Sequence, residues 1–261
     1  MSESVTVERD GHVLLIGINR PDKRNAWNLD VINGVARAYE QLSTDDEVRV
    51  GVLFGHGDHF SAGLDLAEVG PVVAEQGPAA LSGEGAYDPF GLWGEPPAKP
   101  VVMAVQGISF TLSIELALGS DIVIAANDVR FNQLEIGRGI IPFGGATIRA
   151  ADQLGWGNAM RFLLTAEEFG ADEALRIGLV QEVVEPGEQV ARATAIAQQI
   201  ARQAPLGVQG TLANARMARE QGLAAAREHL AGLLPSIMNS EDAAEGIRSF
   251  LERREGNFTG R

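Results

Sequence analysis

Short apolar runs recur through the first half of the chain and are typical of buried strands. They are rich in β-branched residues and are bounded by Gly, Pro, Asn or Asp. The runs span residues 13–18, 50–54, 101–105 and 122–126. Helical patterns lie between them, over residues 29–42 and around Glu115. This alternation of strands and helices predicts a fold of the α/β class.

The second half of the chain has a different pattern, which from Gly145 onward predicts one helix after another. The longest helical stretches are residues 188–203, 206–219, 223–234 and 241–254. The sequence Asn239-Ser240-Glu241-Asp242 predicts a capped start for the last helix, with acidic residues in its first turn. We therefore expect an α/β half followed by an all-α half.

Two glutamates, Glu115 and Glu135, are each flanked by apolar residues. At the helical period Glu115 shares its face with apolar residues such as Leu112, whereas Ser113 and Ser120 fall on the opposite side. A buried, unpaired carboxylate is unfavourable by several kcal/mol or takes up a proton as its pKa rises. Either result suits a general acid or base. The alternative is that one glutamate caps a helix N-terminus and the other points to solvent.

Composition and charge limit the domain number, the partners and the chemistry that we expect. The chain has 261 residues, enough for one large or two small domains. Its 21 Lys and Arg against 35 Asp and Glu give a formal net charge of -14, which disfavours binding to nucleic acid or to an anionic membrane. The absence of cysteine excludes disulfides, thiol nucleophiles and cysteine-ligated metal centres.

The first ten residues lack a basic region followed by an apolar one, so no signal or transit peptide is predicted. No apolar run approaches the roughly 18 residues of a membrane helix. We therefore expect a cytoplasmic protein that does not enter a membrane.

Several common catalytic and binding motifs are absent from the chain. Residues 55–60 begin like a dinucleotide-binding loop, but the third glycine is missing. No phosphate-binding loop of the Walker type and no Gly-x-Ser-x-Gly elbow occurs. The four histidines show no helical metal-binding spacing, so we expect no metal site; they are His12, His56, His59 and His229.

Residues 70–100 are rich in Gly, Pro and Ala and contain few charges. They also contain Tyr87, Phe90 and Trp93. Two interpretations remain open: a mobile linker, or a loop whose aromatic side chains line an apolar ligand pocket.

An ordered series of motifs covers nearly the whole chain and resembles the crotonase, or enoyl-CoA hydratase, superfamily from end to end. Several independent motifs in order and at workable spacing are poorly explained by chance. The motifs are Asn19-Arg20-Pro21-Asp22-Lys23-Arg24-Asn25-Ala26, residues 57–66, residues 99–107, Glu115-Leu116-Ala117-Leu118-Gly119-Ser120-Asp121, residues 131–135, residues 139–142 and the tail 245–254.

The resemblance implies an α/β fold built as a crotonase-like spiral of ββα units, followed by a helical C-terminal region that forms trimers. We expect the spiral core to span residues 1–200 and the helical oligomerisation region residues 201–261. Members of the superfamily bind acyl-CoA thioesters, and their trimers often pair into hexamers. The expected partners are therefore an acyl-CoA and further copies of the chain. No cofactor is expected beyond coenzyme A as part of the substrate.

The resemblance also implies roles for individual residues. Two backbone N–H groups, those of Leu64 and Leu112, would stabilise an enolate-like oxyanion. Lys23 and Arg24 are candidate partners for the CoA phosphates, although a solvated turn is an equally good interpretation. The full set implied for CoA binding is Lys23, Arg24, Ala26, Ala62, Leu64, Asp65, Leu66, Ala67, Phe250 and Arg253.

In hydratases of this superfamily, two glutamates hold a water and deliver its elements across the α,β double bond of an enoyl-CoA. The motifs place these glutamates at Glu115 and Glu135. One carboxylate takes a proton from the attacking water, and the other carboxyl group, which is protonated, donates a proton to the α carbon. Isomerases of the superfamily typically use one acid/base group, so the presence of both glutamates favours hydration.

The chain departs from the superfamily at the segment that carries the second oxyanion donor. A glycine-rich run is usual there, but this chain has Thr111-Leu112-Ser113. A backbone donor needs no particular side chain, yet the Leu112 side chain narrows or occludes the acyl pocket if it points inward. Three hypotheses follow: a hydratase or dehydratase acting on an unusual enoyl-CoA, an isomerase or other crotonase reaction, and a non-catalytic acyl-CoA-binding protein. We expect the acyl pocket to be shaped by residues 70–100.

Overall fold

The computed structural model describes residues 4–261, and its centre is a six-stranded sheet with the order β1-β2-β3-β4-β6-β9. The edge strand β1 runs antiparallel to β2, and every other neighbouring pair is parallel. The register of β2 and β3 runs from Val13 opposite Val50 to Ile18 opposite Gly55. The strands are β1 (Val5–Asp10), β2 (Val13–Ile18), β3 (Val50–Gly55), β4 (Val101–Val105), β6 (Ile122–Ala126) and β9 (Glu182–Val184).

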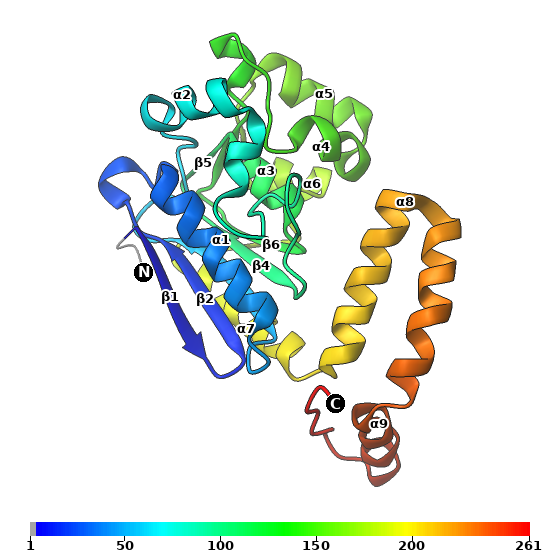
Figure 1. The fold of residues 1–261 in the computed structure, drawn as a ribbon. Helices are drawn as coiled ribbons and strands as arrows, with labels where there is room; N and C mark the ends of the chain where they lie inside the picture. The colour runs from blue at the N-terminus through cyan, green and yellow to red at the C-terminus, as the bar shows by residue number, and fades with distance from the viewer. Residues whose placement is uncertain (1–3) are drawn as a thin grey trace.

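Both faces of the sheet are buried at β2, β3, β4 and β6, which explains why these strands read as continuous apolar runs. Leu14, Leu53 and Met103 belong to the core on one face, together with residues of helix α1 (Leu29–Thr44). Val52 and Val102 point to the other face, where alanines of helix α7 (Gln189–Ala201) pack against them. Figure 1 shows α1 and α7 covering the sheet from its two sides.

A second, three-stranded sheet has the order β5-β7-β8. Its strands are β5 (Ile108–Phe110), β7 (Arg130–Asn132) and β8 (Phe169–Gly170). β5 pairs with β7 in parallel, with Phe110 opposite Asn132. Because β5 follows β4 directly and leads into helix α3 (Leu112–Gly119), the small sheet sets where α3 begins.

The α/β class and the four predicted strands are confirmed, but the expected all-α second half is wrong. β8 and β9 both lie beyond Gly145 and complete the two sheets by pairing with β7 and β6. They are only two and three residues long, too short for alternation to show in the sequence. The edge strand β1 was also not predicted.

The remaining helices surround the sheets and connect their strands. Between β3 and β4 lie α2 (Leu66–Gln76) and a 3₁₀ turn at Pro78–Ser82. Two further 3₁₀ turns occupy Pro21–Lys23 and Glu135–Arg138. The helices between β7 and β9 are α4 (Ala146–Leu154), α5 (Trp156–Thr165) and α6 (Ala171–Ile177).

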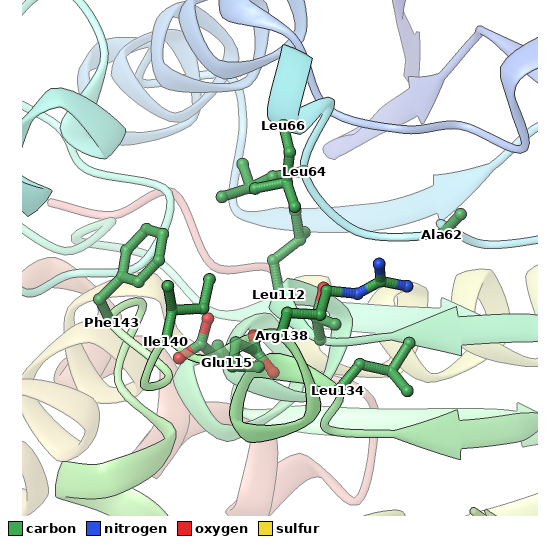
Figure 2. Close-up of a pocket in the computed structure, with 11 residues that line it drawn as sticks. Ala62, Leu64, Leu66, Leu112, Glu115, Leu134, Arg138, Ile140 and Phe143 are labelled. Atoms are coloured by element: carbon green, nitrogen blue, oxygen red, sulfur yellow. The ribbon is translucent and has the colours of Figure 1, made fainter. Parts of the chain in front are cut away.

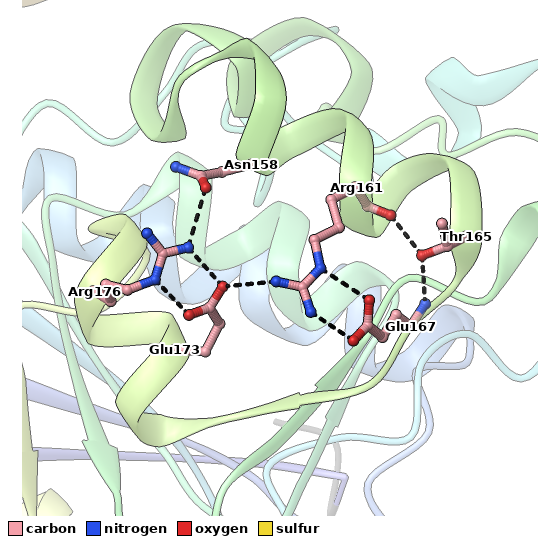
Figure 3. Close-up of polar contacts among 6 residues, drawn as sticks. All are labelled: Asn158, Arg161, Thr165, Glu167, Glu173 and Arg176. Atoms are coloured by element: carbon pink, nitrogen blue, oxygen red, sulfur yellow. Dashed lines mark hydrogen bonds and ion pairs between the residues drawn. The ribbon is translucent and has the colours of Figure 1, made fainter.

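The turn from α5 to α6 is held by exposed ion pairs (Figure 3). Arg161 contacts Glu167 at 2.6 Å and Glu173 at 3.4 Å, and Arg176 contacts Glu173 at 2.6 Å. Arg176 also donates to Asn158. Exposed pairs of this kind contribute little stability singly, so this network mainly orients the two helices.

The C-terminal helices stand beside the rest of the molecule (Figure 1). α8 (Pro205–Met238) folds back on itself at Gly222, whose φ of 86° and ψ of 176° are not helical. This break explains why the sequence predicted two helices there. The salt bridge from Arg216 to Asp121, 3.1 Å long, ties α8 to the start of β6. The boundary between residues 200 and 201 stays a prediction. Within residues 4–261, no helix has the length and apolar character needed to cross a membrane.

Helix α9 (Glu241–Glu252) begins at the predicted cap, where Ser240 Oγ accepts a hydrogen bond of 3.0 Å from the Ala243 N–H. We expect Ser240→Ala to destabilise α9 by about 1 kcal/mol, because this donor loses its partner. Hydrogen exchange of the α9 amides measures the change. Ser240→Asp keeps an acceptor and is the matched control. Equal exchange in Ser240→Ala and the parent protein would contradict the assignment of the cap.

Candidate functional site

A cavity of about 240 Å³ opens between the start of α3 and the chain that follows β7 (Figure 2). Its walls come from three segments that are far apart in the sequence. It is lined by Ala62, Leu64, Leu66, Thr111, Leu112, Glu115, Leu134, Glu135, Arg138, Ile140 and Phe143. Glu115 and Glu135 therefore share one cavity, which is otherwise mostly apolar.

Helix α3 carries Glu115 into the interior because the helix is apolar around its whole circumference. All residues from Leu112 to Leu118 are buried, and the Glu115 side chain is only 3% exposed. Ser113, predicted on the opposite side, is also buried, and its hydroxyl donates to the Ser61 carbonyl at 3.2 Å. A helix that is hydrophobic all round belongs inside a protein. The predicted contrast between two faces of this helix is therefore wrong, whereas burial of Glu115 is observed.

Glu115 caps helix α4 with one oxygen and leaves the other without a protein partner. Its Oε1 accepts hydrogen bonds from the N–H groups of Gly144, at 2.8 Å, and Ala146, at 3.2 Å. Within residues 4–261, no donor contacts Oε2. A Cβ on Gly144 would lie 2.5 Å from this oxygen, so the close approach requires glycine. The sequence left helix capping and acid/base chemistry as alternatives for the glutamates. In Glu115 one oxygen caps α4, and the other has no protein partner.

Glu135 has the same division between a held and an unpartnered oxygen. It begins the 3₁₀ turn Glu135–Arg138 and is 7% exposed, so it does not point to solvent. The side chain of Gln133 donates to its Oε1 at 3.0 Å. Its Oε2 is buried and has no hydrogen-bond partner among the described residues. Among the described residues, each glutamate thus has one oxygen that accepts hydrogen bonds and one that has no hydrogen-bond partner.

Burial changes the acidity of both carboxyl groups. Loss of hydration raises the pKa of Glu115 to about 7, and the negative charge of Glu135 adds to the rise. The N–H groups of Gly144 and Ala146 act in the opposite direction. The pKa of Glu135 is also raised, again mainly by burial, with Gln133 and Arg138 opposing the shift. Near neutral pH, Glu115 is therefore present in both protonated and charged forms.

The backbone N–H groups of Leu64 and Leu112 have no acceptor within residues 4–261. Leu112 is the first residue of α3, and the first N–H groups of a helix have no partner inside it. The residues around Leu64 are held by bonds to Trp27, from Trp27 N–H to the Gly63 carbonyl and from Asp65 N–H to the Trp27 carbonyl, each 2.9 Å long. Both predicted donors belong to residues that line the cavity, and the Leu112 side chain leaves that cavity open.

Known proteins resemble this chain over its full length. The family model for enoyl-CoA hydratase/isomerase matches residues 8–261. The chain belongs to the enoyl-CoA hydratase/isomerase, or crotonase, family. The superfamily resemblance inferred from the motifs is thereby confirmed.

Individual relatives within the family carry several names. A crystal structure of a probable enoyl-CoA hydratase/isomerase from Mycobacterium abscessus has a TM-score of 0.95 and 50% identity, covering 99% of each chain. Enoyl-CoA hydratase EchA19 of Mycobacterium tuberculosis is 31% identical over 98% of this chain and 96% of its own length. A carnitinyl-CoA dehydratase of Salmonella heidelberg is 34% identical, with complete coverage of both.

The residues between 23 and 67 that the crotonase resemblance predicts to bind CoA lie close together. The Ala62 N–H donates to the Arg24 carbonyl at 2.9 Å, which brings the exposed turn at Lys23 and Arg24 beside the 62–66 segment. Arg20 contacts Asp65 at 3.4 Å and also donates to the Ala26 carbonyl. Of this predicted set, Ala62, Leu64 and Leu66 line the cavity, and the exposed Ala67 follows on α2.

Phe250 and Arg253 are not brought to the cavity within one chain of this crotonase. Phe250 is on α9 and is 81% exposed, and Arg253 follows the end of that helix. Figure 1 shows α9 at the opposite end of the molecule from α2, which begins at the cavity residue Leu66. A single chain therefore does not join these residues with the other predicted CoA contacts.

The sequence predicted that residues 70–100 shape the acyl pocket, but none of them lines this cavity. Its apolar lining is formed by Leu134, Ile140 and Phe143 together with Leu64, Leu66 and Leu112. Phe90 is buried in the core, where its ring lies 5.9 Å from that of Trp27. Trp93 is half exposed. The apolar run that follows Glu135 was the available signal for part of this lining. Thr111 and Arg138 were also not predicted as cavity residues.

The histidines make structural contacts in this structure. His56 contacts the Thr6 hydroxyl at 2.8 Å, and His59 accepts from the Ile108 N–H at 3.2 Å. Across residues 4–261, no three His, Asp or Glu side chains are grouped so that they could hold a metal ion.

The raised pKa of Glu115 makes protein stability depend on pH. The folded-state pKa of Glu115, about 7, exceeds the ordinary value of 4.5. The stability that this difference contributes is therefore fully present below pH 4.5 and is lost as pH rises through 7. We expect Glu115→Gln, which cannot ionise, to avoid this loss and to gain roughly 3 kcal/mol relative to the parent by about pH 8. Urea unfolding across this pH range measures the difference. Glu8→Gln, on the exposed edge strand, is the control, and parallel curves for Glu115→Gln and the parent would show that Glu115 ionises normally.

Proposed function

We propose that the protein is an enoyl-CoA hydratase, which adds water to the α,β double bond of an acyl-CoA thioester or removes it in the reverse direction. The observation that carries the proposal is the pair of unpartnered Oε2 atoms on Glu115 and Glu135, in one cavity with the free N–H groups of Leu64 and Leu112. Two carboxyl groups with one free oxygen each provide two contacts for a water molecule.

In the proposed reaction the thioester oxygen accepts hydrogen bonds from the Leu64 and Leu112 N–H groups. The charged glutamate takes a proton from the water as the water oxygen bonds to the β carbon. The electron pair of the double bond moves to the α carbon and the thioester, forming an enolate that the two donors stabilise. The protonated glutamate then delivers its proton to the α carbon. The product is the 3-hydroxyacyl thioester, and the elements of one water have been added.

The acidity of the two carboxyl groups supports one acting as the base and the other as the acid. A pKa of about 7 for Glu115 makes its charged and protonated forms comparably populated near neutral pH. Because the two carboxyl groups influence each other, one charged and one protonated group is the favoured state of the pair. An isomerase, the second candidate, needs only one acid/base group and would leave the second free oxygen unexplained.

We further propose that CoA binds along the 62–67 segment, with Ala26 and Asp65 beside the pantetheine and with Lys23 and Arg24 near the phosphates. The exposure of Lys23 and Arg24 and the hydrogen bond from the Ala62 N–H to the Arg24 carbonyl support this placement. The distance of Phe250 and Arg253 from the cavity within one chain supports a homo-oligomer, a trimer or a pair of trimers, in which another copy supplies them. We place this assembly in the cytoplasm.

Hydratase activity is measured by the loss of absorbance of a conjugated enoyl-CoA. The substrate panel contains short, long, branched and aromatic acyl groups. We expect turnover with at least one member, and a fall on the order of 10²-fold or more in kcat for Glu115→Gln and for Glu135→Gln, because each variant loses a proton-transfer group. CoA affinity should stay near that of the parent.

Glu8→Gln provides the matched control, since it removes the same charge from the exposed strand β1. Binding of every thioester without turnover would contradict an enzymatic function and favour the non-catalytic acyl-CoA-binding protein. Migration of the double bond without hydration would favour the isomerase.

The proposed contribution of Arg253 from another copy is tested by Arg253→Glu. We expect KM for an enoyl-CoA to rise roughly fivefold with little change in kcat, because an exposed charge contact contributes about 1 kcal/mol. An enoyl-pantetheine, which lacks the nucleotide phosphates, should show no such rise. Arg9→Glu on β1 controls for the change in net charge. Equal KM values for parent and Arg253→Glu would remove Arg253 from the CoA site.

A further inference from the structure

Thr111 has a backbone conformation that its side chain disfavours. Its φ of 52° and ψ of -109° lie in the region that favours glycine, and a β-branched residue there is a clear outlier. Such conformations persist only where the surroundings hold them, and they cluster at functional sites. The position immediately precedes Leu112, whose N–H is one of the two proposed oxyanion donors.

Hydrogen bonds on both sides hold Thr111 in this conformation. Its N–H donates to the Asn132 carbonyl at 2.8 Å, at the end of β7. Its carbonyl accepts from the Ile114 N–H at 2.9 Å and from the Glu115 N–H at 3.4 Å, in the first turn of α3. The direction of the Thr111 side chain is therefore set by the small sheet and by α3 together.

The Thr111 hydroxyl lies between the two segments that carry the proposed donors. Its Oγ1 packs directly against Gly63, so closely that a Cβ at Gly63 would overlap it. Gly63 itself has a φ of 107° and immediately precedes Leu64. Thr111, Leu64 and Leu112 all line the cavity. The hydroxyl thus lies where the 63–64 and 111–112 segments meet.

This hydroxyl has no hydrogen-bond partner within residues 4–261. Neither the Leu64 nor the Leu112 N–H donates to it, so it does not take the place of a ligand oxygen on those donors. By contrast, the neighbouring Ser61 and Ser113 hydroxyls donate to the Asn25 and Ser61 carbonyls. A hydroxyl without a protein partner, on a partly buried residue that lines the cavity, retains its O–H donor for a ligand.

We propose that the Thr111 hydroxyl is a third donor to the thioester oxygen, acting as a catalytic residue beside the Leu64 and Leu112 N–H groups. The proton stays on Oγ1, and the hydrogen bond strengthens as negative charge develops on the oxygen in the enolate. This inference rests on the proposed function, since it concerns the oxyanion of that reaction. It gives the unfavourable backbone of Thr111 a chemical role: the side chain adds a donor that glycine at this position would lack.

The decisive variants are Thr111→Val, which keeps the β-branched shape without a donor, and Thr111→Ser, which keeps the donor. We expect Thr111→Val to lower kcat on the order of 10²-fold, whereas Thr111→Ser retains most of the rate. Thr44→Val, at the exposed end of α1, is the matched control for loss of a threonine hydroxyl. Thermal unfolding verifies that each variant is folded.

A spectroscopic readout separates hydrogen bonding from packing. A 4-dimethylaminocinnamoyl-CoA thioester absorbs at longer wavelength as donors polarise its carbonyl. We expect a smaller red shift on binding to Thr111→Val than to the parent or to Thr111→Ser. Equal red shifts and equal kcat values in Thr111→Val and the parent would overturn the proposal.

The same thioester distinguishes failure of this inference from failure of the hydratase proposal. If the glutamate variants lose no activity but Thr111→Val still reduces the red shift, the hydratase mechanism fails and the third donor stands. If the glutamate variants are inactive and Thr111→Val is unchanged in both measurements, the mechanism stands and the third donor is excluded. If Thr111→Gly matches the parent in both rate and red shift, the hydroxyl is likewise excluded as a donor.

Discussion

The hydrogen bonds between the Glu115 carboxylate and the start of α4 are the interaction on which the site depends. A carboxylate this deeply buried needs hydrogen-bond donors, and the N–H groups of Gly144 and Ala146 supply them. The helix dipole of α4 favours negative charge at the same point. Because α3 is apolar on every side and Gly144 leaves no room for a side chain, α3, α4 and the chain before α4 form one unit around this group.

The second part of the site is held by backbone geometry and buried hydroxyl contacts. The Ser61 hydroxyl donates to the Asn25 carbonyl, and the Ser113 hydroxyl donates to the Ser61 carbonyl. These bonds connect the 61–64 segment to the chain at Asn25 and to α3. The segment 134–143 is held by its own backbone hydrogen bonds, from the Gly137 N–H to the Leu134 carbonyl and from the Ile140 N–H to the Glu135 carbonyl, each 3.1 Å long.

Prediction from sequence succeeded where local pattern and burial agree. β2, β3, β4 and β6 are buried on both faces, so each appears as an unbroken apolar run. β8 and β9 were missed because pairing with strands distant in the sequence makes them strands, and their few residues contain no periodicity of their own. Residues 70–100 were assigned to the acyl pocket on their aromatic content, but the fold uses Phe90 as core behind the site.

By itself, the sequence determined the crotonase family, the α/β class and the two glutamates in apolar surroundings, because these follow from ordered motifs and from the pattern of apolar neighbours. Only the tertiary structure decided which oxygen of each glutamate is free, which segment walls the cavity, that the Thr111 hydroxyl lies against Gly63, and that α9 lies away from its own chain's site. The physical reason is that a local pattern encodes whether a side chain is buried, whereas the groups that share a cavity depend on contacts between segments far apart along the chain.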